Sequence, residues 1–308
     1  MKKDALMFQV PPRKKVRVII NTDAKNEADD PFVLAHHLMT PKFDVKGIIA
    51  CHFETKAKEF GVGKTMQLSY DEVELVLKLM GLTGEYPVAK GAQFPMVDEK
   101  TPQVSEGARM IIDEAMKEDE RPLYVLFQGG LTDLASAILM EPKIQGRFTA
   151  VWIGGGAYPK GEVEFNMKQD FAAVNVVMDS GVELWQIPSS TYRQVTVTLS
   201  ELQARVAPHQ ELGAYLFRQM VELNDRKADR LDWPHGESWV LGDQPTVTVL
   251  LEDRGSKNYD IMPAPRVNND CTYTLREDGR PIRVYHTVDA RMTMEDFYAK
   301  LSLFFPRS

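Results

Sequence analysis

The segment Val16–Leu38, VRVIINTDAKNEADDPFVLAHHL, places acidic residues between two apolar runs. The first run, Val16–Ile20, is short and rich in β-branched residues, which predicts a buried strand. The second run begins at Pro31 and predicts a helix, because the first turn of a helix tolerates proline well. The acids between the two runs are Asp23, Glu27, Asp29 and Asp30. The acids therefore lie where a buried strand gives way to a helix.

Strands and helices continue to alternate after this segment. Short apolar runs predict further strands at Phe43–Cys51, Leu123–Phe127, Thr149–Ile153 and Val182–Ile187. Helical patterns are found at Pro31–Met39, Lys58–Leu82, from Leu131 onward, and at Phe171–Ser180. This alternation predicts an α/β fold of Rossmann-like type, in which helices flank a mostly parallel central sheet on both faces.

The last third of the chain has a different pattern. Further helices are predicted at Leu199–Ala207, Leu212–Ala228 and Gln244–Leu251. Residues 271–288 predict a C-terminal hairpin that turns at Asp278–Gly279. A final helix is expected near Thr293, where Thr-x-x-Asp resembles a capping box. Since no repeat or linker divides the chain, residues 1–308 are interpreted as a single domain with an N-terminal arm at 1–15.

The composition narrows the class of protein. The chain has 308 residues, of which 44% are hydrophobic and 26% charged, as in ordinary globular proteins. Its net charge of −7 argues against binding nucleic acid, since phosphate requires a basic surface. The two cysteines are too few for a disulfide framework, and we expect a cytoplasmic location. No apolar run approaches the length of a membrane span, so no membrane partner is expected.

The acids after the first strand predict a metal site. Ligands of open parallel sheets bind at the carboxyl ends of the strands, which is where these acids lie. Neighbouring carboxylates repel one another unless a cation neutralises them, and Ca²⁺ or Mg²⁺ prefers oxygen ligands. Alternatively, Asp29 or Asp30 only caps the helix that begins at Pro31. Because Asp23 and Asp30 together follow a buried strand, we favour a metal.

Four segments, in this order, resemble the inosine–uridine-type nucleoside hydrolase family. Asn21-Thr-Asp23 followed by Asp29-Asp30 resembles the opening D-x-D-P-G-x-D-D motif of that family. The three later segments are GGLTDLASAIL (129–139), WIGGG (152–156) with EVEFNMKQDFAAVNVVMDSG (162–181), and LGDQPTVTVLL (241–251). The resemblance extends over roughly residues 16–300 and implies the α/β fold of the family.

The same resemblance implies an activity and a site. Members of the family hydrolyse the N-glycosidic bond of ribonucleosides and hold a tightly bound Ca²⁺. The implied metal ligands are Asp23, Asp30, Asp243 and the backbone carbonyl of Gln128. Asp23 would also act as the general base on a metal-bound water. The residues that would hold ribose hydroxyls are Asp29, Glu164 and Asn166. Carboxylates suit this chemistry because they stabilise an oxocarbenium-like transition state.

The chain departs from the family pattern in ways that suggest a divergent branch. Asn21 replaces the first Asp of the opening motif, and the loop from Asp23 to Asp29 is two residues longer than in the family. Glu54 falls at about the position where the family has an Asn after the second strand. A change there could alter how the ribose or water is held, so Glu54 is a candidate for substrate binding.

A further departure concerns the leaving group. Many members have a His directly before the late Asp, where it protonates the departing base; this chain has Gly242. His52, at the end of a predicted strand, and His235, in the loop DWPHGESW, are the candidate replacements, and the sequence does not choose between them. Trp233 and Trp239 beside His235 suit either base stacking or ordinary packing.

Three functions remain open on the sequence. The leading one is a Ca²⁺-dependent N-ribohydrolase that acts on a small-molecule nucleoside or riboside. The second is a catalytically weak or inactive nucleoside- or sugar-binding homologue. The third is a Mg²⁺-dependent phosphohydrolase, against which stands the absence of a D-x-D nucleophile pair at Asn21. The resemblance also implies a homodimer or homotetramer, whereas the accepted base is not readable.

Overall fold

A predominantly parallel sheet forms the centre of the computed structural model, which describes residues 5–252 and 258–307. Its eight strands have the order β3-β2-β1-β4-β5-β6-β12-β9. Among the described strands of this sheet, only β9 pairs antiparallel to its neighbour, β12. The strands are β1 Val16–Thr22, β2 Phe43–Ala50, β3 Val88–Lys90, β4 Leu123–Phe127, β5 Thr149–Ile153, β6 Glu183–Ile187, β9 Tyr259–Pro263 and β12 Pro281–Tyr285. The predicted α/β fold is confirmed.

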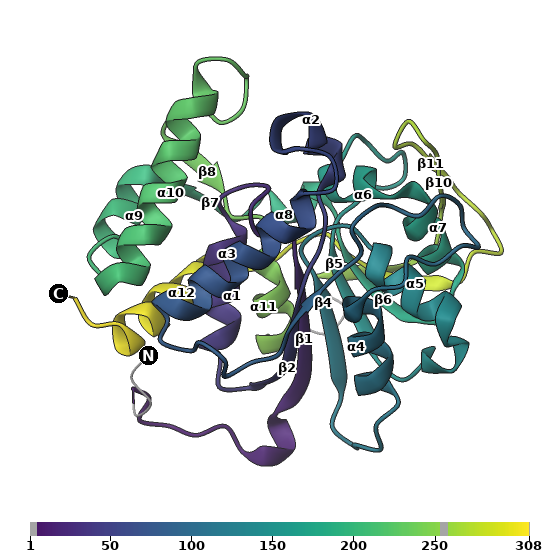
Figure 1. Ribbon diagram of the computed structural model, residues 1–308, viewed down its shortest axis with the longest axis horizontal. Helices are drawn as coiled ribbons and strands as arrows, with labels where there is room; N and C mark the ends of the chain where they lie inside the picture. The colour runs from purple at the N-terminus through teal and green to yellow at the C-terminus, as the bar shows by residue number, and fades with distance from the viewer. Residues whose placement is uncertain (1–4, 253–257, 308) are drawn as a thin grey trace.

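Helices lie on both sides of the sheet (Figure 1). On one side are α1 (Asp30–Leu38), α3 (Thr65–Leu79), α9 (Leu199–Arg205), α10 (Gln210–Ala228), α11 (Pro245–Leu251) and α12 (Ala290–Phe304). On the other are α4 (Glu106–Ala115), α5 (Thr132–Met140) and α7 (Phe171–Asp179). Because strand side chains alternate in direction, Val18 and Ile20 enter one core and Ile19 the other. None of the described helices has both the length and the apolar character needed to cross a membrane.

Short elements connect these layers and form much of the rim of the sheet. The short helices are η1 Pro12–Lys14, η2 Glu54–Lys56, α2 Ala57–Phe60, η3 Pro142–Ile144, α6 Phe165–Gln169 and α8 Ser189–Tyr192. The short strands pair as β7 (Thr196–Thr198) with β8 (Ser238–Val240) and β10 (Arg266–Val267) with β11 (Tyr273–Thr274).

The position of β1 determines where a ligand can bind. All seven of its residues are buried, and it pairs with β2 on one side and with β4 on the other. The chain therefore changes direction across the sheet at β1, and a crevice opens between the carboxyl ends of β1 and β4. Asp23 follows the first of these strands and Gln128 follows the second.

Two predicted elements differ from the structure. The helix predicted at Lys58–Leu82 is interrupted, because Gly61 and Gly63 have φ values of 101° and 69°, which glycine adopts without strain. The hairpin predicted within residues 271–288 is wrong. Its second half, β12, pairs with β6 and β9 instead, since Ile282 and Val284 are buried in the core of the main sheet.

The capping box predicted at Thr293 is also wrong. Helix α12 already begins at Ala290, and its N-cap is Asp289, whose side chain accepts a hydrogen bond from the Met292 amide. Thr293 lies in the first turn and donates its hydroxyl to the Asp289 carbonyl at 2.7 Å.

Candidate active site

A cavity of about 540 Å³ lies at the carboxyl end of the sheet. This volume is within the range of about 300 to 1,000 Å³ that is usual for small-molecule sites. The cavity has walls from several segments. They include Asn26, Glu27, Asp29 and Asp30 after β1, Gln128 after β4, Val163–Asn166 and Lys168 around α6, Tyr192 and Arg193 after β6, Trp233 and His235 after α10, and Gly242 with Asp243 before α11. The cavity thus coincides with the crevice that the strand order creates.

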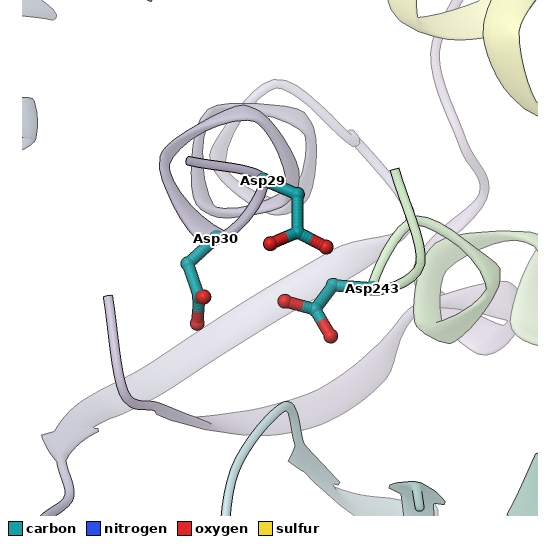
Figure 2. A group of neighbouring side chains, drawn as sticks. All are labelled: Asp29, Asp30 and Asp243. Carbon is teal, nitrogen blue, oxygen red and sulfur yellow. The ribbon is translucent and has the colours of Figure 1, made fainter. Parts of the chain in front are cut away.

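Three carboxylates converge in this cavity (Figure 2). Asp29 and Asp30 lie at the start of α1, and Asp243 comes from the turn before α11. One oxygen from each of the three lies within 4.8 Å of the others. Burial raises the pKa of all three carboxyls well above the usual range, and repulsion from neighbouring carboxylates raises it further. A bound cation would relieve both penalties.

The oxygen atoms at and beside the three carboxylates are of the kind that bind a hard divalent cation. Asp30 uses Oδ1 to accept a hydrogen bond from the Thr22 hydroxyl, whereas its Oδ2 is buried without a partner in the described chain. The side-chain oxygen of Gln128 is also buried and has no hydrogen-bond partner among the described residues. Carboxylate and amide oxygens are the ligands that Ca²⁺ and Mg²⁺ prefer. Asp29, Asp30, Asp243 and Gln128 would together hold such an ion.

Asp23 lies behind this group and does not line the cavity. Its side chain is 0% exposed, and its Oδ1 accepts a hydrogen bond of 3.0 Å from the Asn26 amide. Burial raises the pKa of Asp23 to about 8. The predicted ligand set contained Asp23, whereas the group that the structure brings together contains Asp29 in its place. Asn26 belongs to the lengthened loop.

Gln128 and Asn166 join the ends of β4 and β5. The Asn166 side-chain amide donates to the Gln128 carbonyl at 3.0 Å and to the Ile153 carbonyl at 2.9 Å. The carbonyl that was predicted to bind the metal accepts this hydrogen bond and keeps a second lone pair, and the side-chain oxygen of Gln128 is buried without a partner among the described residues. Both amide hydrogens of Asn166 are used, so its Oδ1 is the atom available to a ligand.

Glu164 is fixed at the N-terminus of α6. Its carboxylate accepts hydrogen bonds from the backbone amides of Gly155, Asn166 and Met167 at 2.8 to 3.1 Å. The Tyr192 hydroxyl donates a fourth hydrogen bond at 3.2 Å. Burial raises the pKa of Glu164 despite these donors. The side chain lines the cavity, as the sequence predicted.

The model of the family described as inosine-uridine preferring nucleoside hydrolase matches residues 18–295. The chain belongs to this family. The hydrolase of this name from Crithidia fasciculata is 33% identical over 124 residues, which are 37% of this chain and 37% of that protein. Its counterpart from Leishmania major is 32% identical over 83 residues, 26% of each chain. The matched segments thus span little more than a third of the first relative and about a quarter of the second.

Solved structures of nucleoside hydrolases match nearly the whole fold. The purine-preferring ribonucleoside hydrolase from Gardnerella vaginalis has a TM-score of 0.74 at 17% identity, over 94% of this chain and 98% of that one. An inosine-guanosine nucleoside hydrolase has a TM-score of 0.71 at 16% identity, over 94% and 99%. The predicted family membership is confirmed, and the structural likeness at these identities concerns the fold.

Two predicted site residues of this nucleoside hydrolase homologue lie outside the cavity. Glu54 accepts hydrogen bonds from the Gly63 amide at 3.1 Å and from the Thr65 hydroxyl, so it fixes the loop before α3. His52 is 1% exposed, and its Nε2 lies 2.9 Å from the Thr132 hydroxyl. That hydroxyl donates to Asp170 at 2.8 Å and must therefore accept from His52.

These contacts give His52 a structural part. Because Nε2 carries the proton, Nδ1 can accept a hydrogen bond from the Glu54 amide at 3.4 Å. The ring is therefore neutral, and both of its nitrogens form hydrogen bonds. Burial also lowers the pKa of His52 to about 4. The sequence places His52 and Glu54 after the end of a strand, but this position alone does not show that both side chains turn away from the cavity.

His235, by contrast, lies at the rim of the cavity together with Trp233. The ring of Trp233 lies 5.0 Å from that of Trp239, which is buried in the core. Trp233 is therefore the tryptophan available to a ligand, and Trp239 supports it.

Other cavity residues were not predicted from the sequence. Glu27 lines the cavity, and burial raises its pKa although Lys56 and Lys227 oppose this shift. Tyr192, Arg193 and Lys168 also line it. Glu27 was visible as a member of the acidic stretch, whereas no motif in the sequence singles out Tyr192.

Proposed function

We propose that the protein hydrolyses the N-glycosidic bond of a ribonucleoside or related riboside with the help of a divalent cation, and that this cation is Ca²⁺. The convergence of Asp29, Asp30 and Asp243 in a cavity of suitable volume carries the proposal. Membership of the nucleoside hydrolase family supports the reaction class and the choice of metal. When bound, the cation would lower the pKa of water and orient it.

The side chains that line the cavity, together with the buried Asp23, have separate roles in the reaction. Asp29, Glu164 and the Oδ1 of Asn166 hold ribose hydroxyls and fix the sugar. Asp23 accepts a proton from the attacking water through its unpartnered Oδ2. A cation bound beside Asp23 would lower the pKa of this carboxyl and so favour the ionised form that this step requires. Glu27 adds a further negative charge in the cavity, which stabilises the developing oxocarbenium-like charge of the sugar.

His235 is the proposed proton donor to the leaving base. It is the histidine of the described chain that lines the cavity, and its exposed loop position gives it access to a base at the cavity mouth. Trp233 beside it offers an aromatic surface for stacking. A matched pair of variants, His235→Gln and the exposed His286→Gln, tests this assignment. We expect only the first to slow the release of base.

A binding protein without turnover is the second candidate. Gly242 in place of a histidine favours it. A related fold is known to hold a riboside ligand: the type III effector XopQ was solved in complex with adenosine diphosphate ribose and has a TM-score of 0.65 at 14% identity. A phosphohydrolase is less well supported, because the Asn21 amide donates to buried Asp133 at 3.3 Å and offers no nucleophile.

A panel of ribonucleosides with reducing-sugar detection, with and without chelator, tests these candidates. Ribose released only when a divalent cation is present supports hydrolysis. Thermal stabilisation by nucleosides without any product supports the binding protein, and phosphate released from a phosphoester supports the third function. Asp243→Asn should abolish ribose release, whereas Asp225→Asn, on the exposed face of α10, should leave it unchanged. Size-exclusion chromatography of the same samples tests the expected homodimer or homotetramer.

A further inference from the structure

Tyr192 fills the space in which a side chain at position 242 would lie. A Cβ atom added to Gly242 would lie 2.9 Å from Cδ2 and 3.4 Å from Cε2 of the Tyr192 ring. The first distance is shorter than a carbon–carbon contact of about 3.5 to 4.0 Å allows. Both residues line the cavity. The tyrosine ring and a side chain at position 242 therefore exclude each other.

The backbone around Tyr192 is fixed. Its amide donates to the Pro188 carbonyl at 3.0 Å, and its carbonyl accepts from the Val195 amide at 3.1 Å. The neighbouring Thr191 hydroxyl donates to the Tyr285 carbonyl at 2.6 Å, which joins α8 to β12. Val195 in turn accepts from the Leu241 amide at 2.8 Å, so the segments that carry Tyr192 and Gly242 are connected directly.

The hydroxyl of Tyr192 points to the carboxylate of the sugar site. It donates to Oε1 of Glu164 at 3.2 Å. Burial and the charge of Glu164 raise the pKa of the phenol well above its usual value, so the hydroxyl stays protonated. Its oxygen still carries lone pairs that can accept a hydrogen bond from a ligand in the cavity.

We propose that Tyr192 is a substrate-positioning residue, which orients Glu164 toward the sugar and prevents any side chain at position 242 from reaching the leaving group. The inference rests on the proposed hydrolysis of a riboside. It has a consequence for the leaving group, because a proton for the base has to come from another side chain of the cavity, for which His235 is proposed. His235→Gln should therefore slow the cleavage of inosine, whereas ribosides whose leaving group departs without protonation, such as 4-nitrophenyl β-D-ribofuranoside, should be cleaved as fast as before.

The positioning role is tested with Tyr192→Phe, which keeps the ring and removes the hydroxyl. We expect KM for the riboside to rise about tenfold while kcat changes less, since one hydrogen bond to a charged group is lost. Glu164→Gln combined with Tyr192→Phe should cost less than the product of the single effects, because the two groups act together. Tyr158→Phe is the matched control, since its hydroxyl lies outside the cavity and is buried without a partner in the described chain. Equal KM values for Tyr192→Phe and wild type would overturn the role.

A direct binding measurement separates this role from the reaction itself. D-ribose should raise the Tm of the calcium-loaded wild type and of Tyr158→Phe, and raise it less in Tyr192→Phe. This comparison supports the role even if no riboside is hydrolysed, in which case the proposed function alone is wrong. No rise with D-ribose in the wild type, or an equal rise in Tyr192→Phe, contradicts it.

The steric relationship is tested by exchanging the two residues. Gly242→His alone should reduce kcat/KM for inosine at least tenfold, because the new side chain displaces the tyrosine ring. In a protein that carries His235→Gln and Tyr192→Ala, adding Gly242→His should raise kcat/KM for inosine by about 10²-fold, the usual contribution of a general acid, and leave kcat/KM for the 4-nitrophenyl riboside unchanged. Full inosine activity in Gly242→His alone, or no gain when Gly242→His is added to the variant without His235 and Tyr192, would overturn the steric part of the proposal.

Discussion

A carboxylate oxygen of Asp29 lies within 4.8 Å of one of Asp243, although the two residues are 214 positions apart in the chain (243 − 29). This proximity places the start of α1 beside the turn before α11 and brings Asp30 into the same group. It also explains why the sequence alone could align Asp243 with a family motif but could not show which acids it meets.

The first prediction follows from the repulsion within this group. Ca²⁺ at a hundred times its dissociation constant should stabilise the fold by about 2.7 kcal/mol, which raises Tm by roughly 5 to 10 °C over the chelated protein. Asp243→Asn should reduce this rise, and Asp225→Asn should not. Differential scanning calorimetry with and without chelator measures it. Equal Tm values for the calcium-loaded and chelated wild type would show that no such site exists.

The second prediction distinguishes the acids within the tight group from the one behind it. Asp29→Asn should weaken Ca²⁺ binding more than Asp23→Asn does, because an oxygen of Asp29 lies within 4.8 Å of those of Asp30 and Asp243. Asp23→Asn should instead slow turnover by about 10² to 10⁴, the usual contribution of a general base. Isothermal titration with Ca²⁺ and kinetics on each variant give the comparison. The reverse order of affinities would return Asp23 to the metal-binding group.

The fold was predictable where burial alone determines the structure. The fully buried β1 and the acids after it were evident because β-branched residues end abruptly at Asn21. The hairpin failed since strand pairing depends on which strand edge is free, and β12 fills the edge of β6. Pairing across the sheet is a property of the whole chain, so a local turn signal could not override it.

The site was predictable to the extent that motifs mark it. Asp29, Asp30, Asp243, Glu164 and Asn166 all line the cavity, in segments that the resemblance identified. Side-chain direction was not predictable, and His52 and Glu54 turn into the protein at the end of β2. Tyr192 carries no sequence signal, because its importance comes from a contact with Gly242 that only the folded chain creates.

The third prediction concerns Asn166 as a connection between strands. Asn166→Ala should leave the carbonyls of Gln128 and Ile153 without their donor, at a cost of about 1 to 3 kcal/mol in the free energy of unfolding. Urea denaturation measures this loss, and Lys168→Ala, whose exposed side chain follows in the same helix, is the control. An unchanged unfolding midpoint for Asn166→Ala would mean that water replaces the lost donor.

The fourth prediction uses the buried, neutral His52. Its pKa is lowered from 6.5 to about 4, so below pH 6.5 the unfolded chain binds a proton here that the folded chain does not. The free energy of unfolding should therefore fall as the pH drops from 6.5 toward 4, and His52 alone should contribute about 3 kcal/mol to that fall. His52→Gln should be less stable than wild type at pH 7.5 but lose less stability on acidification.

His36 and His37, whose pKa values burial also lowers, titrate alike in both proteins and cancel in the comparison. Denaturant titrations between pH 7.5 and 4 give the slopes, with the exposed His286→Gln as the control. Parallel slopes for wild type and His52→Gln would mean that His52 takes up its proton in the folded state and is free to act in acid–base chemistry.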